Sequence, residues 1–247
     1  MKNAVLALVA LFMAFINQSH AQGGGPDQII KIKKDKYYQL ARISVNPEKK
    51  AQFDDYFAKL GPTMMASGLK IVGRFSVVEA LDGNGPAQMI LIGEYPNAEA
   101  PKALFSSEEF LNLRNQRDAS ITYLNEGYFQ ATEDGEFNVG DSEVLEMASL
   151  WMKEDGQPKL NAYFQAVMPE ATQLGLRIAP FRFISASEKG NYHPSVVVLG
   201  SWKTQKGRDQ FFNGATFKAH VAKRTAALKF LEMYVIKSLP MGGQTQH

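Results

Sequence analysis

Residues 89–117 read MILIGEYPNAEAPKALFSSEEFLNLRNQR, and residues 196–224 read VVVLGSWKTQKGRDQFFNGATFKAHVAKR. Laid over one another without a gap, at a shift of 107 positions, the two stretches share glycine, phenylalanine and arginine at matched places. The matched pairs are Gly93 with Gly200, Phe110 with Phe217 and Arg117 with Arg224. Glycine and the aromatic residues fix turns and packing, so these matches indicate one structural unit that is written twice.

The same shift extends over most of the chain and defines two units. Further matched pairs are Tyr56 with Tyr163, Pro62 with Pro169, Gly68 with Gly175, Ile71 with Ile178, Gly83 with Gly190, Phe105 with Phe212 and Leu124 with Leu231. Each unit has about 100 residues, an ordinary domain size. We expect domains over 37–131 and 143–238, a polar linker over 132–142, a flexible leader over 22–36 and a disordered tail over 239–247.

Hydrophobic periodicity changes in a fixed order within each unit. In the first unit it predicts strands over Tyr37–Val45, Leu69–Leu81, Gln88–Tyr95 and Ile121–Ala131, with helices from Asn46 to Ala66 and from about Ala98 to Arg117. Ser107, followed by two glutamates, has the form of a new helix start, so a break is expected near Ser106-Ser107. The second unit repeats this order, with strands over Val144–Lys153, Leu176–Ser187, Ser195–Trp202 and Leu228–Ile236.

This βαββαβ order is the ferredoxin-like arrangement, in which helices cover one face of a sheet. The other face of the sheet is apolar and must be buried. Two copies in one chain can bury these faces against each other. The expected fold class is therefore α+β, with two tandem ferredoxin-like domains packed sheet to sheet as an intramolecular α+β barrel, a pseudo-dimer.

Composition excludes several classes of function. The chain has 247 residues, with 27 Lys+Arg against 25 Asp+Glu, a balance without the basic excess typical of nucleic-acid binding. Cysteine is absent, which excludes disulfides, thiolate nucleophiles and Cys-ligated metal sites. The sequence contains no phosphate-binding loop, dinucleotide fingerprint, serine-hydrolase elbow or zinc-protease motif.

The first 21 residues have the pattern of a signal peptide. Lys2 precedes the apolar run Ala4–Ile16, which is too short to span a bilayer because a span needs about 20 residues. Ser19-His20-Ala21 supplies small residues for cleavage near Ala21. We expect a periplasmic or secreted, soluble protein with no membrane span; the alternative is a buried N-terminal helix.

The first unit resembles a known family at several motifs. These are Ile92-Gly93-Glu94-Tyr95-Pro96-Asn97-Ala98-Glu99-Ala100, Leu104-Phe105-Ser106-Ser107-Glu108-Glu109-Phe110 and Gly68-Leu69-Lys70-Ile71-Val72-Gly73-Arg74. They are similar to an uncharacterised family of the dimeric α+β barrel superfamily, whose relatives include antibiotic-biosynthesis monooxygenases and haem-binding chlorite dismutases. The resemblance implies the barrel fold and only weakly implies a function.

Within that resemblance, five residues occupy the family's recurrent polar and aromatic positions: Arg74, Glu94, Ser107, Phe110 and Arg117. The second unit departs from the pattern, with Phe181 at the position of Arg74 and Ser201 at that of Glu94. This difference predicts one functional half and one scaffold half, or a single composite site.

Two sets of residues are candidates for a site. Glu94 could act as an acid or base, with Arg74 steering an oxyanion. A structural ion pair, in which Arg74 and Arg117 neutralise Glu94, is the simpler interpretation. Phe75, Tyr95, Arg117, Phe181 and Trp202 could line a pocket for a flat apolar molecule, or simply fill the space between the sheets. For Arg117 and its repeat Arg224, capping a helix C-terminus is a further interpretation.

Histidine offers little support for a metal or cofactor. His193 lies in the loop Gly190–Pro194, where a solvated turn residue is the simpler interpretation. His220 is expected on a helix, as in haem-binding relatives, but Lys223 and Arg224 stand where an orienting carboxylate would be needed. We expect no metal and no cofactor.

Three functions remain open. The first is binding of a small apolar or aromatic molecule between the two sheets. The second is a cofactor-independent monooxygenase-like or isomerase-like enzyme that uses Glu94 and Arg74. The third is a structural module that presents its outer helices to a partner protein. The sequence leaves both a monomer and a homodimer possible.

Overall fold

The computed structural model describes residues 29–83, 85–140 and 142–239. The predicted signal peptide over 1–21 lies outside the described residues. The first unit consists of β2 (Tyr37–Val45), the short helix η1 (Pro47–Lys49), α2 (Lys50–Ala66), β3 (Lys70–Asp82), β4 (Met89–Tyr95), α3 (Glu99–Ser106), α4 (Glu108–Ser120) and β5 (Ile121–Ala131). The second consists of β7 (Val144–Met152), α5 (Gly156–Gln173), β8 (Leu176–Ile178), β9 (Phe183–Gly190), β10 (Val196–Trp202), α6 (Gln205–Asn213), α7 (Ala215–Ala227) and β11 (Leu228–Ser238).

Helix starts and ends follow local signals in the sequence. The Asn46 side chain accepts a hydrogen bond from the Glu48 amide at 3.0 Å, which caps η1. The Ser107 hydroxyl accepts from the Phe110 amide at 3.2 Å, so α4 begins at the predicted break. After α2 and α5 the chain turns at Gly68 (φ 81°) and Gly175 (φ 99°), a matched pair of the repeat in the left-handed region.

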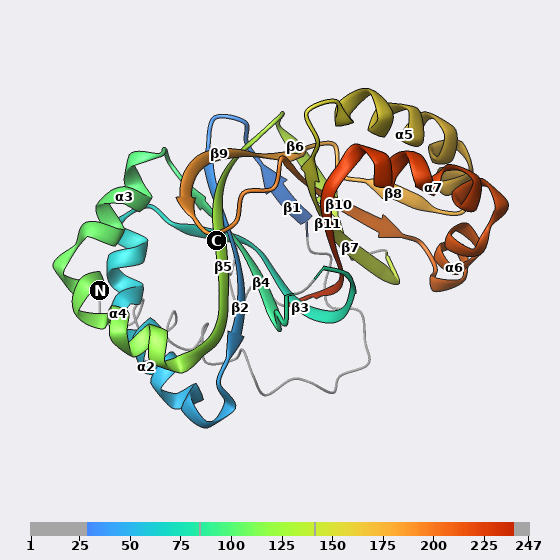
Figure 1. The fold of residues 1–247 in the computed structure, drawn as a ribbon. Helices are drawn as coiled ribbons and strands as arrows, with labels where there is room; N and C mark the ends of the chain where they lie inside the picture. Colours follow the sequence, from blue (N-terminus) through green and yellow to red (C-terminus); the bar gives the residue numbers. More distant parts are fainter. Residues whose placement is uncertain (1–28, 84, 141, 240–247) are drawn as a thin grey trace.

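The strands of both units form one closed antiparallel barrel. Hydrogen-bonded neighbours run in the order β7-β11-β3-β4-β2-β5-β9-β10, and β10 pairs with β7 to close the ring. The units meet at two seams, β11 with β3 and β5 with β9, where Gln130 lies opposite Ile184. Figure 1 shows α2–α4 outside the barrel on one side and α5–α7 on the other. The predicted α+β barrel pseudo-dimer is confirmed.

The second strand of the second unit is split, whereas the sequence predicted one strand over Leu176–Ser187. Strand β8 ends at Ile178, and β9 begins only at Phe183. Pro180 lies in the gap, where it cannot donate a backbone hydrogen bond to a ladder. The last helical segment of the second unit is also divided, into α6 and α7. The division lies at Gly214, the counterpart of Ser107.

A two-stranded ribbon packs onto the barrel core. Strand β1 (Ile29–Ile32) pairs with β6 (Gly135–Asn138), and its Ile30 and Ile32 side chains are buried. These residues belong to the same apolar cluster as the inward-facing side chains of the barrel. Residues 29–32, assigned to a flexible leader by composition, are therefore an ordered strand, and the expected linker contains β6.

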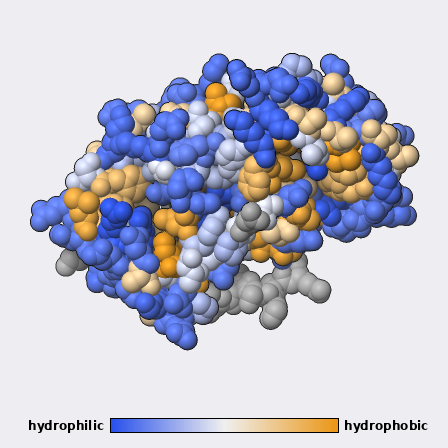
Figure 2. Space-filling view, in the orientation of Figure 1, coloured by the Kyte–Doolittle hydropathy of each residue, from blue (hydrophilic) through white to orange (hydrophobic). Residues whose placement is uncertain are grey.

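Apolar side chains are divided between the barrel interior and two layers beneath the helices. Inward-facing residues include Tyr38, Leu40, Phe75, Ile90, Ile92, Met147, Phe181, Phe183, Val197, Leu199 and Ile236. Separate clusters lie under the helices of each unit. Figure 2 shows that the visible outer surface of the helices is largely hydrophilic, with smaller apolar patches. In the part of the chain that the structure describes, no helix is long and apolar enough to cross a membrane.

Candidate functional site

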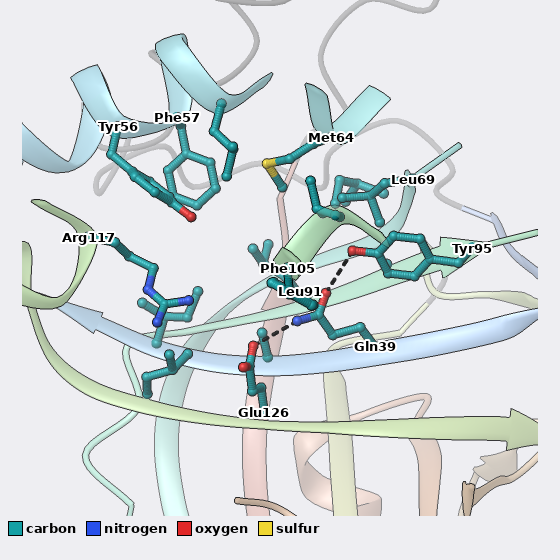
Figure 3. A pocket seen from close by; sticks show the side chains of 17 residues that line it. Gln39, Tyr56, Phe57, Met64, Leu69, Leu91, Tyr95, Phe105, Arg117 and Glu126 are labelled. Atoms are coloured by element: carbon teal, nitrogen blue, oxygen red, sulfur yellow. Dashed lines mark hydrogen bonds between the residues drawn. The ribbon is translucent and has the colours of Figure 1, made fainter. Parts of the chain in front are cut away.

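A pocket lies between the outer face of the first unit's sheet and helices α2–α4 (Figure 3). Its volume is about 80 Å³, and most of its wall is apolar. The apolar wall includes Ile43, Phe57, Leu60, Met64, Leu91 and Phe105. Such a pocket favours a small ligand, because an apolar cavity of about 150 Å³ is known to hold benzene.

A chain of hydrogen bonds crosses the sheet side of this pocket. The Tyr95 hydroxyl on β4 donates to Oε1 of Gln39 on β2 at 3.3 Å. Nε2 of Gln39 donates in turn to Oε2 of Glu126 on β5 at 2.7 Å. These three side chains share one face because β2 lies between β4 and β5 and side chains alternate along each strand. Gln39 therefore fixes the orientation of the Glu126 carboxyl group (Figure 3).

Burial raises the pKa of the Glu126 carboxyl group, while Arg117 and the hydrogen bond from Gln39 act in the opposite direction. Arg117 comes from the last turn of α4 and lies across the pocket from Glu126 in Figure 3. Its side chain is 16% exposed and pairs with Asp118, from Nη2 to Oδ1 at 2.8 Å. The pocket thus places a desolvated carboxyl group near a guanidinium group.

Tyr56 of α2 supplies a further hydroxyl group on the helix side of the pocket (Figure 3). Burial raises the pKa of Tyr56 to about 12, although Arg117 lowers it in part. Tyr56 is therefore a neutral hydrogen-bond donor at physiological pH. Donors from Tyr56 and Arg117 and the carboxyl group of Glu126 could together hold one polar group of a small molecule.

The second unit also helps to hold Glu126. The Asn191 side chain, in the loop after β9, accepts a hydrogen bond from the Glu126 amide at 2.9 Å and donates to the Leu124 carbonyl at 3.0 Å. The Asn191 amide donates to the Glu126 carbonyl at 3.0 Å. Closure of the barrel therefore positions the backbone that carries the acidic group of the pocket.

The corresponding place in the second unit is occupied by side chains. Glu146 stands at the position of Gln39, and it accepts from Trp202 Nε1 at 2.9 Å and from Arg208 Nε at 2.6 Å. The Trp202 ring packs on Phe211, with the ring centroids 5.3 Å apart. Met233 replaces Glu126. The two units thus share a fold but differ in the side chains at this place.

The register places Glu94 and Arg74 apart. Glu94 lies opposite Tyr38, whose hydroxyl donates to Glu94 Oε2 at 3.2 Å inside the barrel. Arg74 lies opposite Leu91, three residues before Glu94 along β4, so its side chain is directed to the other face of the sheet. The hypothesised pairing of Glu94 with Arg74 is therefore not formed.

The five predicted ligand-binding residues fall in three places. Phe75 and Phe181 are buried in the barrel interior. Trp202 is buried beneath the helices of the second unit. Tyr95 and Arg117 line the pocket, which lies outside the barrel rather than between the two sheets. The sequence thus named two residues of this pocket, whereas the pocket that it expected lay between the two sheets.

Arg117 and Arg224 also have matching structural roles. Each lies in the last turn of its helix, α4 or α7, where a cation is favourable. The guanidinium of Arg117 lies 5.4 Å from the ring centroid of Phe110, and that of Arg224 lies 5.6 Å from Phe217. The arginine thus recurs because a cation is favourable at both helix ends. Arg117 contributes to the pocket because the residues that surround it line that pocket.

The described histidines do not suggest a metal or haem site. His193 Nε2 lies 3.3 Å from the Gly190 carbonyl oxygen in an exposed loop contact. His220 lies on α7, and the layer between this helix and the sheet is filled by buried side chains such as Val167, Trp202 and Phe211. A haem does not fit this filled layer. Among residues 29–83, 85–140 and 142–239, no group of three or more His, Cys, Asp or Glu could hold a metal ion.

Sequence reasoning missed Gln39, Tyr56 and Glu126 as members of one site. Each lies in an element that was predicted correctly, on β2, α2 and β5. A signal was available in the repeat itself, since Gln39 aligns with Glu146 and Glu126 with Met233. Polar residues that change between two otherwise similar units mark the places where the units differ in chemistry.

Comparisons with known proteins agree with this fold. Residues 36–124 match the family model of a domain of unknown function, DUF1330. An anthrone oxidase-like protein is 14% identical, with a TM-score of 0.51 over 87% of this chain and 98% of its own. A chlorite dismutase variant from Candidatus Nitrospira defluvii is 9% identical, with a TM-score of 0.53 over 85% of this chain and 93% of its own.

The family match confirms the resemblance stated for the first unit. At identities of 9% and 14%, the likeness to the two solved structures concerns the fold alone. A search of curated proteins finds no match for this chain.

Proposed function

We propose that the first unit binds a small, mostly apolar molecule with one hydroxyl or carbonyl group in the pocket between its sheet and α2–α4. The observation that carries this proposal is the partly buried, desolvated carboxyl group of Glu126, held by Gln39 in a mostly apolar cavity. Buried polar groups are costly unless they are satisfied, so their convergence in a cavity favours a polar partner there.

The volume sets the size of the ligand. A cavity of about 80 Å³ holds a molecule smaller than benzene, unless side chains at its wall move. Short-chain ketones, aldehydes and alcohols have this size and carry a single polar group. Phenol is the upper test case, because its ring requires more space than the pocket offers as it stands.

A calorimetric titration and thermal-shift series with butanone, butanol and phenol tests the binding. Leu124→Phe adds volume at the pocket wall and should abolish the shift. Its repeat counterpart, Leu231→Phe, adds the same volume beneath the helices of the second unit and should leave binding unchanged. Binding that survives Leu124→Phe would contradict the proposed location.

A second candidate function, favoured by the raised pKa of Glu126, is proton transfer at a carbon next to a carbonyl group. The Glu126 carboxylate would take the C–H proton, while Arg117 and Tyr56 would stabilise the enolate oxygen. The proton would return to carbon or oxygen, so the step needs no oxidant. This assignment replaces the one that combined Glu94 with Arg74.

Deuterium exchange of butanone in D2O, followed by NMR, measures this activity directly. Glu126→Gln should lower the exchange rate by about 10²–10⁴-fold, the usual contribution of a positioned base. Glu136→Gln, at an exposed carboxylate, is the matched control. Exchange that is equal in the wild type and in Glu126→Gln would leave the pocket as a binding site only.

For the destination of the chain, we propose export with cleavage after Ala21. The support is the apolar run Ala4–Ile16 followed by Ser19-His20-Ala21. N-terminal sequencing of the protein recovered from its native cells should give Gln22 first. Recovery of an intact Met1 would contradict export by this route.

A further inference from the structure

A buried ion pair crosses the barrel interior from one unit to the other. Arg42 on β2 is 1% exposed, and its Nη1 pairs with Oε2 of Glu232 on β11. The Arg42 guanidinium also lies over the ring of Tyr192. Oε1 of Glu232 accepts from the Tyr234 hydroxyl at 2.7 Å. The first unit thus supplies the cation, and the second unit supplies the carboxylate and the aromatic ring.

This ion pair has no counterpart at the matched positions of the repeat. Ser149 stands at the position of Arg42 and accepts from the Tyr192 hydroxyl. Asn125 stands at the position of Glu232, and its Nδ2 donates to the Tyr123 hydroxyl at 2.7 Å. Both substitutes are uncharged, so neither Arg42 nor Glu232 has a charged counterpart in the repeat.

Aliphatic residues of β4 and β10 at the same interface are similar in the two units. Ile90 and Ile92 on β4 face inward, and their counterparts on β10 are Val197 and Leu199. An apolar face of this kind accepts either unit with similar loss of exposed area. The charged residues inside the barrel can therefore add a choice of partner that these aliphatic positions do not provide.

We propose that Arg42 and Glu232 select the partner of each sheet face, so that a first unit pairs with a second unit and not with another copy of itself. Two first units face to face would bury two Arg42 guanidinium groups opposite asparagine. Two second units would bury two Glu232 carboxylates opposite serine. Since an unpaired buried charge is far more costly than a paired one, both like pairings are disfavoured.

Charge reversal tests this selection in the full chain. Arg42→Glu and Glu232→Arg each bring like charges together, and each should lower Tm by roughly 6–20 °C. The double variant Arg42→Glu/Glu232→Arg restores opposite charges and should recover most of that loss. Recovery distinguishes a requirement for opposite charges from a requirement for one particular side chain at each position.

Mixing the two single variants tests the selection of partners most directly. Refolded together from guanidinium chloride, the Arg42→Glu and Glu232→Arg chains can exchange units, and each exchanged barrel then contains one Glu and one Arg. Native mass spectrometry should show a 1:1 heterodimer that neither chain forms alone. The control reverses the exposed pair Lys31 and Glu136 in the same way and should give no heterodimer.

Three results would overturn the proposal. The single variants could remain monomeric, with Tm close to that of the wild type. The double variant could stay as unstable as the single ones. The mixture could refold, or aggregate, without forming the heterodimer.

Discussion

At the scale of single residues, the chemistry of the pocket depends on which face of the sheet each side chain occupies. Arg74 shows how one extra residue in a strand changes the face of the sheet on which a later side chain lies. Strict alternation from Lys70 would place Arg74 on the face of Glu94, but the register of β3 shifts between Ile71 and Gly73. A bulge of this kind moves every later side chain to the other face. Sequence periodicity locates the strand but not the bulge.

The pKa of Glu126 makes a prediction about stability. Because the folded state raises this pKa above its unfolded value of about 4.3, folding favours the protonated form. The stabilisation is complete below the unfolded pKa and is lost as the pH rises through the folded pKa. Glu126→Gln should therefore resemble the wild type in acid and be the more stable protein near neutral pH.

Urea unfolding of both proteins from pH 4 to pH 8 measures this difference. Glu136→Gln changes an exposed carboxylate, and its difference in stability from the wild type should not increase with pH. A Glu126→Gln protein that is less stable than the wild type at neutral pH, with a gap that widens as the pH rises, would show that the carboxylate is stabilised by the fold.

At the scale of elements, the sequence predicted most of the architecture. The strand over Ile121–Ala131 has the predicted bounds, and the helix break at Ser107 is where its cap indicated. The split between β8 and β9 was missed because hydrophobic periodicity is read over many residues and does not reveal the effect of one proline, Pro180. The break at Gly214 was missed because glycine gives no side-chain cap.

Two glycines near the end of α2 predict opposite effects of the same substitution. Gly61 is inside the helix with open space around an added Cβ atom, so Gly61→Ala should stabilise the fold by about 0.5–1 kcal/mol. Gly68 has φ +81°, and its added Cβ atom would lie 3.0 Å from Pro96 Cδ. Gly68→Ala should destabilise the fold by about 1 kcal/mol or more. Denaturant unfolding of both variants checks the sign; equal effects would contradict the assigned turn.

Asn191 tests whether the second unit supports the pocket. Asn191→Ala removes the side-chain hydrogen bonds to Glu126 and Leu124, and should cost about 1–2 kcal/mol of unfolding free energy. Hydrogen exchange at the Glu126 amide should also become faster. Asn213→Ala, which removes an exposed side-chain bond to the Asp209 carbonyl, is the control. Unchanged hydrogen exchange at the Glu126 amide would show that the loop with Asn191 does not hold the backbone of the pocket.

At the scale of the whole molecule, the duplicated chain is symmetric in fold and asymmetric in chemistry. The first unit keeps a pocket with Gln39 and Glu126, whereas Trp202 and the Glu146–Arg208 pair fill the same layer of the second unit. The internal repeat made the barrel predictable from the sequence. The position of the pocket was not predictable, because it depends on how side chains from α2–α4 pack over the sheet.

The absence of cysteine allows the closure of the barrel to be measured by crosslinking. Gln130 and Ile184 are paired across the seam between β5 and β9, and both are exposed. Two cysteines at these positions lie within the range that a disulfide can bridge. Cysteines at Gln130 and Ser76 serve as the control, because β2 and β4 separate β5 from β3.

Mild oxidation of the Gln130→Cys/Ile184→Cys chain, followed by mass spectrometry of its peptides, tests the central claim that the two units close one barrel within a chain. We predict a disulfide within each molecule, formed in full at high dilution and absent from the control pair. Free thiols in both variants, or crosslinks that join only separate chains, would contradict an intramolecular barrel.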